Sequence, residues 1–201
     1  MDIFFLSMLI AVSYHLVKTR YQARRIALLG SHLSQFQIEK LMENLTQGYL
    51  RALGESDAER REQIWNLLGS TEVALCEQFN RFATGFAREE AAETRVSTLP
   101  VALPYADKLL PSATFDLRQM MQVHAQGISA AAQNGAQRRL RDKAFTLSAE
   151  LFLMQHSCHW FCKSKTVASA RMLARHQTTH AQLLAGVSAQ TRNAYQKLVG
   201  P

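Results

Sequence analysis

Apolar side chains follow one another almost without interruption from residue 3 to residue 17, and basic side chains come directly after them. As a helix these residues extend about 22 Å, which is short of the roughly 30 Å hydrocarbon core of a bilayer. We therefore expect a membrane helix whose end, at Tyr14, His15 and Lys18, lies near the interface. The predicted membrane-anchor residues are Ile3, Phe4, Phe5, Leu6, Met8, Leu9, Ile10, Val12, Leu16 and Val17.

The charges beside this run predict whether it is cleaved as a signal peptide and how it is oriented in the membrane. A secretory signal peptide carries basic residues before its apolar core, whereas here Asp2 precedes the run and the basic residues follow it, so we expect it to be retained. Segments rich in Lys and Arg stay in the cytoplasm, which predicts a single-pass cell-membrane protein with its N-terminus outside. The side chains expected to contact anionic lipids are Lys18, Arg20, Arg24 and Arg25.

The same apolar run permits a second interpretation. A helix buried in the middle of a soluble bundle is also apolar all round and also of this length. In that case the protein would be cytoplasmic, without an anchor. The three cysteines, an odd and sparse set, favour a reducing compartment under either interpretation.

Beyond residue 30, apolar positions recur every three or four residues, which is typical of amphipathic helices. Gly30 and Ser31 predict a break before the first of these helices, which ends near Gly54. A second helix is expected from the capping box at 56–59 toward Glu90. The apolar stripe of the first helix consists of Ile38, Leu41, Met42, Leu45, Tyr49 and Leu53.

Residues 94–111 interrupt this periodicity and hold three of the four prolines. Each proline removes a backbone donor and restricts the residue before it, so a long helix is excluded here. We interpret the segment as an ordered crossover with a short turn of helix at 105–110. Its apolar residues Val101, Leu103, Leu109 and Leu110 suggest that it lies against the bundle.

The next helix is expected to begin at Ser112 and to end at the Asn134-Gly135 turn. Residues 144–162 are apolar on two faces of a helix, which predicts burial on both sides or one face shown to a partner. Whether this helix continues into the thinner stripe of 166–198 or breaks at 163–166 stays open. The side chains predicted to form the partner surface are Phe145, Phe152 and Trp160.

Together these patterns predict an all-α protein, an elongated bundle of four to five helices with an N-terminal hydrophobic helix. Residues 1–29 would form that helix and its basic segment, and residues 30–201 the bundle domain with its crossover at 94–111. The composition agrees, because 47% hydrophobic residues with 9 Gly and 4 Pro are typical of a folded helical chain.

The net charge of +7 is concentrated toward the C-terminus, where residues 137–201 carry ten basic and two acidic side chains. This basic third could pack against the more acidic middle of the bundle or meet an external anionic surface. Lipid headgroups are one such surface. Nucleic acid is another, although no recognition motif accompanies the basic residues.

A cluster of His and Cys side chains is the one candidate for metal or haem binding, and no other cofactor is predicted. Its spacing matches neither the paired cysteines of zinc modules nor the attachment motif of c-type haem, and cysteines on a core-facing stripe are commonly buried hydrophobes. Two of the histidines are four apart, but without the glutamate of a metalloprotease helix. The candidate ligands are His156, Cys158, His159, Cys162, His176 and His180.

The sequence assigns no catalytic residue, since it contains neither a Gly-x-Ser-x-Gly elbow nor a phosphate-binding glycine loop. It therefore favours a membrane-anchored accessory, assembly or adaptor protein, which acts by binding a protein partner or a second copy of itself. One alternative is a coat of amphipathic helices on a lipid or polyester granule. The other is a metal- or haem-binding helical protein that uses the cluster above.

Overall fold

Helices account for most of the chain in the computed structural model, which describes residues 2–200. Five of them have 17 residues or more, which confirms the predicted all-α fold with an apolar N-terminal helix. The helices are α1 (Asp2–Leu33), α2 (Ile38–Gly54), α3 (Ala58–Phe86), α4 (Ala91–Thr94), α5 (Ala106–Leu109), α6 (Leu117–Gln133), α7 (Leu140–Cys162), α8 (Lys165–His176), α9 (His180–Gly186) and α10 (Ala189–Val199).

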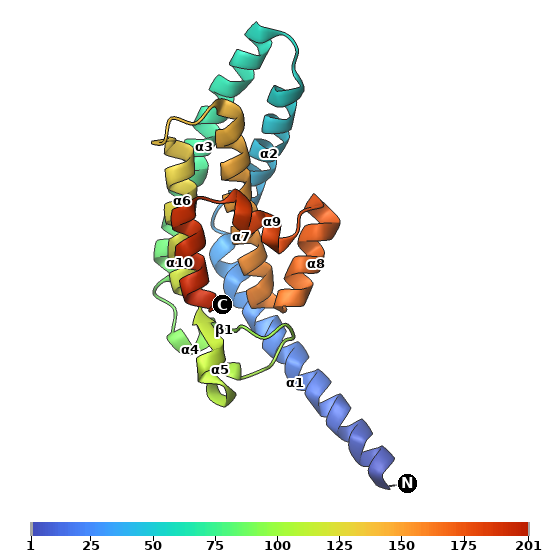
Figure 1. Ribbon diagram of the computed structural model, residues 1–201. Helices are drawn as coiled ribbons and strands as arrows, with labels where there is room; N and C mark the ends of the chain where they lie inside the picture. Colours follow the sequence, from blue (N-terminus) through green and yellow to red (C-terminus); the bar gives the residue numbers. More distant parts are fainter. Residues whose placement is uncertain (1, 201) are drawn as a thin grey trace.

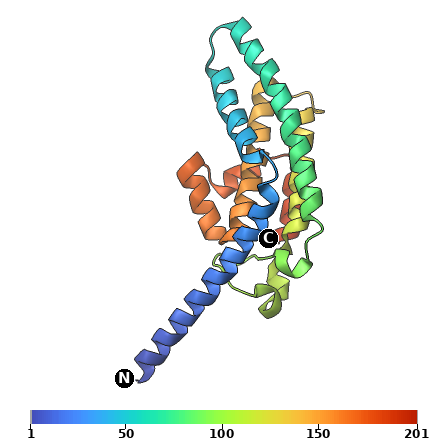
Figure 2. The same cartoon turned by 180° about the vertical axis from the view of Figure 1, so that it is seen from behind.

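Helix α7 is the centre of the bundle, and its two apolar faces are both covered except at Phe145, which is exposed. It contacts α1, α2 and α6 as well as α8 and α9, which follow it in the chain. The α2–α3 hairpin forms one end of the molecule, and the first half of α1 projects from the other end (Figures 1 and 2). Burial on both faces is therefore the reason why 144–162 lacks a polar side.

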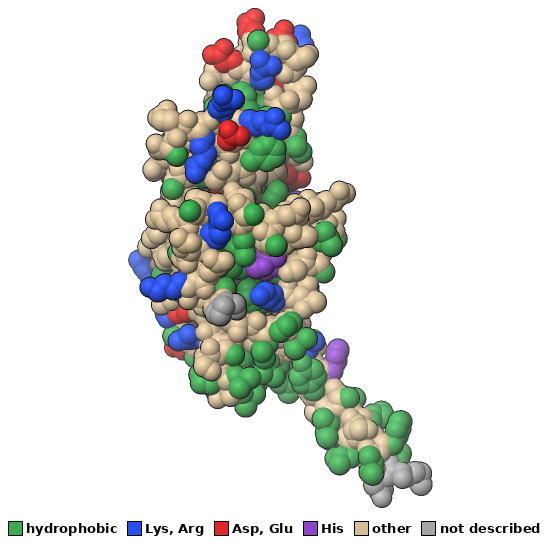
Figure 3. Space-filling view, in the orientation of Figure 1, with side chains coloured by type: hydrophobic (Ala, Val, Ile, Leu, Met, Phe, Trp, Pro, Cys, Tyr) green, Lys and Arg blue, Asp and Glu red, His purple; other side chains and the backbone are tan. Residues whose placement is uncertain are grey.

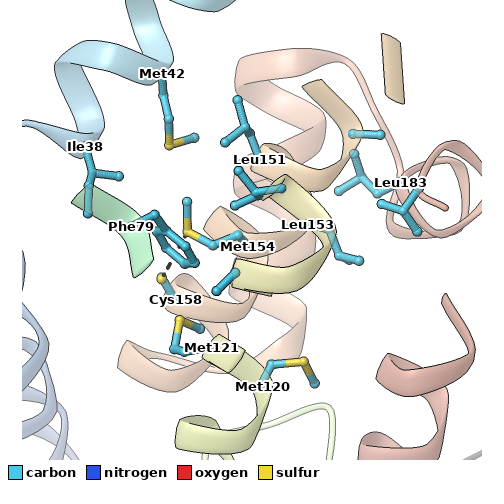
Figure 4. Close-up of a cluster of buried hydrophobic side chains, with 14 of the residues drawn as sticks. Ile38, Met42, Phe79, Met120, Met121, Leu151, Leu153, Met154, Cys158 and Leu183 are labelled. Atoms are coloured by element: carbon cyan, nitrogen blue, oxygen red, sulfur yellow. Dashed lines mark hydrogen bonds between the residues drawn. The ribbon is translucent and has the colours of Figure 1, made fainter. Parts of the chain in front are cut away.

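The core around α7 is rich in sulfur. Met42, Met121 and Met154 are buried around Phe79 and Cys158, and the Cys158 thiol points at the Met154 sulfur, 3.8 Å away (Figure 4). Unbranched thioethers adapt to the irregular gaps that helices leave when they cross. Cys158 is thus a small core side chain in this structure.

Three helix starts differ from those that the sequence predicts. The break expected at 30–31 was wrong, because α1 continues to Leu33, buries Leu29 and uses the Ser31 hydroxyl to donate within its own helix. In addition, α3 is capped by Asp57 and not by Ser56.

The third difference is the start of α6. Its cap is Asp116, whose carboxylate accepts from the Arg118 backbone N–H, and not Ser112. Ser112 lies one strand earlier, in a 3₁₀ turn (Pro111–Ala113) that precedes β2 (Thr114–Asp116). A tertiary contact, the pairing of β2, therefore delays the helix.

The chain breaks at 163–166, between α7 and α8. Ser164 leaves helical geometry and its hydroxyl accepts from the Val167 N–H, so it caps α8. Thr179 and Ser188 cap α9 and α10 in the same way, which divides the last third of the chain into three short helices. Side-chain caps at each start satisfy N–H groups that a helix cannot satisfy itself.

The segment between α3 and α6 is ordered. It contains α4, β1 (Arg95–Ser97), α5 and β2, with β1 and β2 paired antiparallel so that Val96 faces Phe115. The short helix expected at 105–110 is α5. We keep the name crossover for residues 94–111.

Candidate membrane-contact site

The first half of α1 is exposed on all sides. All ten predicted anchor side chains are exposed, from 43% at Val17 to 85% at Ile3. Helix α1 is long and apolar enough to cross a membrane, and none of its most hydrophobic window is buried in the protein. The buried-helix interpretation of the apolar run therefore finds no support in this fold, in which hydrophobic side chains surround the projecting end of the helix (Figure 3).

The second half of α1 packs firmly on the bundle. Leu29 is 4% exposed and belongs to the core. His32 Nε2 lies 2.8 Å from the Glu89 carboxylate, and the His32 ring meets the edge of Phe86. Helix α1 thus consists of a free half, residues 3–17, and a docked half, residues 18–33.

Arg25 binds the docked half of α1 to the bundle. It is 8% exposed, its Nη1 donates to the Phe161 carbonyl at 3.1 Å, and its Nη2 donates to the Arg95 carbonyl. The guanidinium also lies over the rings of Tyr21 and Phe161, at 4.4 and 4.7 Å from their centroids. Because the Phe161 carbonyl is among the last of α7, it has no partner inside its own helix and lies at the negative end of the dipole.

The predicted lipid-contact set is therefore smaller than the sequence indicates. Arg25 faces the protein interior, which corrects its assignment to the headgroups. Arg24 is largely exposed and pairs with Glu93 at 2.8 Å. Arg20 is exposed, and the ammonium of half-buried Lys18 lies 5.8 Å from the centroid of the Tyr14 ring. Lys18, Arg20 and Arg24 thus form the accessible basic set.

The crossover lies beside the free half of α1. Tyr14 Oη donates to the Ala102 carbonyl at 2.9 Å, and the rings of Tyr21 and Tyr105 are 5.4 Å apart. Between the two segments runs an apolar groove of about 420 Å³. Its lining residues are Leu9, Ile10, Ser13, Tyr14, Val17, Leu103, Pro104, Tyr105 and Leu109.

The expectation that the apolar crossover residues lie against the bundle was wrong for three of the four. Val101, Leu109 and Leu110 are 64%, 63% and 44% exposed, and only Leu103 is half-buried. Other apolar side chains of the crossover do pack on the bundle, since Val96 and Ala106 are 1% and 3% exposed. Polar contacts add to this packing: Trp160 Nε1 donates to the Ser97 carbonyl, and the Thr166 N–H to the Pro100 carbonyl. The periodicity rules that find helix faces give no signal in such a segment.

The three predicted partner-surface residues do not form one surface. Phe145 is 56% exposed under the guanidinium of Arg141. Phe152 is half-buried and stacks on His176, with ring centroids 4.0 Å apart. Trp160 is 2% exposed and packs against Phe115 of β2, so the structure corrects its placement on the surface.

The six predicted metal ligands also point to different places. Cys158 faces the core, and His159 Nδ1 lies 3.2 Å from the Arg171 guanidinium. His156 and His180 stack face to face, with centroids 4.4 Å apart, while His176 is turned onto Phe152 and Cys162 lies near the Arg25 charge. Within residues 2–200, no group of three or more His, Cys, Asp or Glu side chains is arranged to hold a metal ion.

His124 and His156, which are both fully buried, and the half-buried His180 form a group that we call the buried histidine cluster, which the sequence does not reveal as a unit. His124 Nε2 lies 2.9 Å from the Ser157 hydroxyl, and His180 Nε2 lies 3.1 Å from the Tyr195 hydroxyl. Burial lowers the pKa of His124 and of His156 to about 3 and that of His180 to about 4. The cluster is therefore neutral at physiological pH.

Comparisons of the chain with protein-family models, with curated proteins and with solved structures find no match.

Replacing Arg25 with alanine is expected to destabilise the bundle by about 3 kcal/mol, because the buried Phe161 carbonyl and the part-buried Arg95 carbonyl lose charge-assisted donors. Arg24 supplies the matched control, since it is the adjacent residue but is largely exposed. Its replacement by alanine is expected to cost less than about 1 kcal/mol. Urea unfolding of both variants in one detergent measures the difference. Equal losses would show that Arg25 does not dock α1.

Proposed function

We propose that the protein is attached to a membrane by the free half of α1 and acts as a binding protein, an accessory, assembly or adaptor subunit. The exposure of all ten anchor side chains carries the proposal. A continuous apolar surface of this size is rare on a soluble monomer and marks a site of contact with membrane or protein. Transfer of one such Leu, Ile, Val, Phe or Met side chain from water to an apolar environment is favourable by about 1.5 to 3 kcal/mol.

The basic residues support a cytoplasmic position for the bundle. Lys18 and Arg20 follow the apolar half directly; Arg20 is exposed and Lys18 is half-buried beside Tyr14, where anionic headgroups would meet both charges. The rule that basic segments remain inside places the rest of the chain on the cytoplasmic face, with the N-terminus of a single-pass helix outside. The partners in this proposal are membrane lipids and a protein, which is either a different chain or a second copy.

The docking of α1 on the bundle supports a role in which the protein holds a binding surface in a fixed orientation at the membrane. Arg25 joins α1 to the end of α7 and to the start of β1, so the anchor and the bundle keep a fixed relative orientation. Because α7 contacts more elements than any other helix does, the orientation of α1 also sets the orientation of the bundle. Such a protein offers one defined face to a partner beside the membrane.

Flotation with lipid vesicles tests the proposal. The full-length chain is expected to rise with the vesicles, and a variant without residues 1–17 is expected to remain at the bottom of the gradient. A folded bundle, checked by circular dichroism, is the control for the truncated variant. If that variant floats as well as the full chain, the bundle itself binds the surface and the granule-coat alternative replaces the anchor.

A further inference from the structure

The crossover exposes apolar side chains on the same end of the molecule as the free half of α1. Val101, Tyr105 and Leu109 are each at least half exposed, and Leu110 is 44% exposed. Hydrophobic side chains gather over this underside of the bundle and along α1 (Figure 3). We propose that the crossover is a second membrane-contact element, which lies in the headgroup layer of the bilayer beside α1. This inference rests on the proposed function.

Contacts between the crossover and α1 place the two segments at the same depth in the membrane. The Tyr14–Ala102 hydrogen bond and the Tyr21–Tyr105 ring contact hold the two segments together, and the groove between them extends from Val17 to Leu9. At 1.5 Å per residue, these eight steps cover about 12 Å of the helix axis. The Tyr14 end of this groove therefore lies in the headgroup layer together with the crossover, and its Leu9 end points toward the acyl chains.

The chemistry of the two segments fits the headgroup layer. Lys18 lies over the ring of Tyr14, and Lys108 lies over the ring of Tyr105, at 5.8 and 5.7 Å from the centroids. Tyr is enriched where a membrane meets water, and Lys extends its charge from an apolar stem toward the headgroups. Two acidic side chains, Asp107 and Glu93, lie near Tyr21, which contacts Tyr105. The α1 and crossover elements thus carry the same pair of residue types at one end of the molecule.

The backbone of the crossover also fits this depth. Pro100, Pro104 and Pro111 have no N–H to satisfy, and the N–H groups of Leu109 and Leu110 donate within the turn of α5. Irregular backbone is excluded from the hydrocarbon core, where no partner replaces water. The headgroup layer still offers water and lipid oxygens, so the crossover can enter it while its apolar side chains reach the acyl boundary.

A lipid occupant follows from continuity with the anchor. The groove opens between α1 and the crossover and is lined mostly by apolar side chains of both, so the surface that faces lipid on α1 continues without a break onto Leu109. An acyl chain can lie along such a groove. A protein partner at the same place would have to displace the lipid that surrounds the free half of α1.

Photo-crosslinking in vesicles tests the inference with the full-length chain. A benzophenone amino acid is placed at Leu109, at Leu9 and at Leu50, one variant at a time, in vesicles of phosphatidylcholine and phosphatidylglycerol. Leu50 is the matched control, because it is 73% exposed on α2, toward the opposite end of the bundle, against 63% for Leu109. Covalent lipid adducts are expected at Leu109 and Leu9 and not at Leu50.

The other outcomes separate the two proposals. Adducts at Leu9 without adducts at Leu109, or a crosslink from Leu109 to protein, overturn the crossover contact and leave the anchor standing. An absence of adducts at both positions overturns the anchor as well. In a second measurement, L109E is expected to weaken vesicle partitioning about tenfold while L50E leaves it unchanged. Equal partitioning of the two variants contradicts the inference.

Discussion

A double substitution of Leu6 and Ile10 by glutamate is expected to release the protein from membranes. The two side chains are one helical turn apart on the free half of α1, and each is 59% exposed in the fold, so the bundle does not depend on them. Each change removes about 2 kcal/mol of favourable transfer and adds a charge that hydrocarbon disfavours. Together they should lower the vesicle partition coefficient by roughly a thousandfold or more.

Co-sedimentation with vesicles over a range of lipid concentrations measures this effect. The control is the same pair of changes at Leu50 and Leu67, which are 73% and 72% exposed on α2 and α3 and lie far from the anchor. That variant has the same added charge and should partition as the unmodified chain does. A loss of binding in the control pair, or its absence in the anchor pair, would refute the assignment of α1.

Acidification from pH 7.5 to pH 5 is expected to destabilise the bundle through the buried histidine cluster. Burial lowers the pKa of His124 to about 3, and burial with the nearby His180 lowers that of His156 to about 3. An unfolded histidine has a pKa near 6.5, so between these values the unfolded chain binds more protons and acid favours it. At pH 5 the loss is on the order of 2 kcal/mol for each of the two residues.

The full contribution of the two histidines is present above about pH 6.5 and falls as the pH decreases toward 3. Glu150 acts in the opposite direction, because burial raises the pKa of its carboxyl and a protonated acid then favours the fold. The contribution of Glu150 is the same in the unmodified chain and in a histidine variant, so a comparison of the two isolates the effect of the histidine. Urea unfolding at both pH values should show a smaller acid loss for H156Q than for the unmodified chain, and no change for a variant of exposed His15. An unchanged acid loss in H156Q would exclude His156 as a contributor.

The helices follow closely from the local pattern of the sequence. The stripe that begins at Ile38 forms α2, whose buried residues include Met42, Leu45 and Tyr49. Periodicity predicts such helices because the repeat of side chains around a helix is a property of neighbouring residues. The starts of α3 and α6 were less predictable, since several polar residues near each start can cap a helix and packing selects among them.

The candidate site follows from the sequence only in part. The apolar run is visible without a structure, but the pairing of Arg25 with carbonyls 136 and 70 residues away is not. Its neighbour Arg24 has the same charge and the opposite environment. The exposure of Leu109 is equally invisible, since an apolar residue in an irregular segment can face either the core or the surroundings.

The sequence by itself determined that this protein is helical, that its first helix is apolar on every side, and that basic residues come after the apolar half. These properties depend on residues within a few turns of one another. The tertiary structure alone decided that this half stays outside the core, that Arg25 is enclosed, and that the crossover lies beside Tyr14. Burial results from contacts between segments that are far apart in the sequence, and a local pattern of residues does not determine the free energy of those contacts.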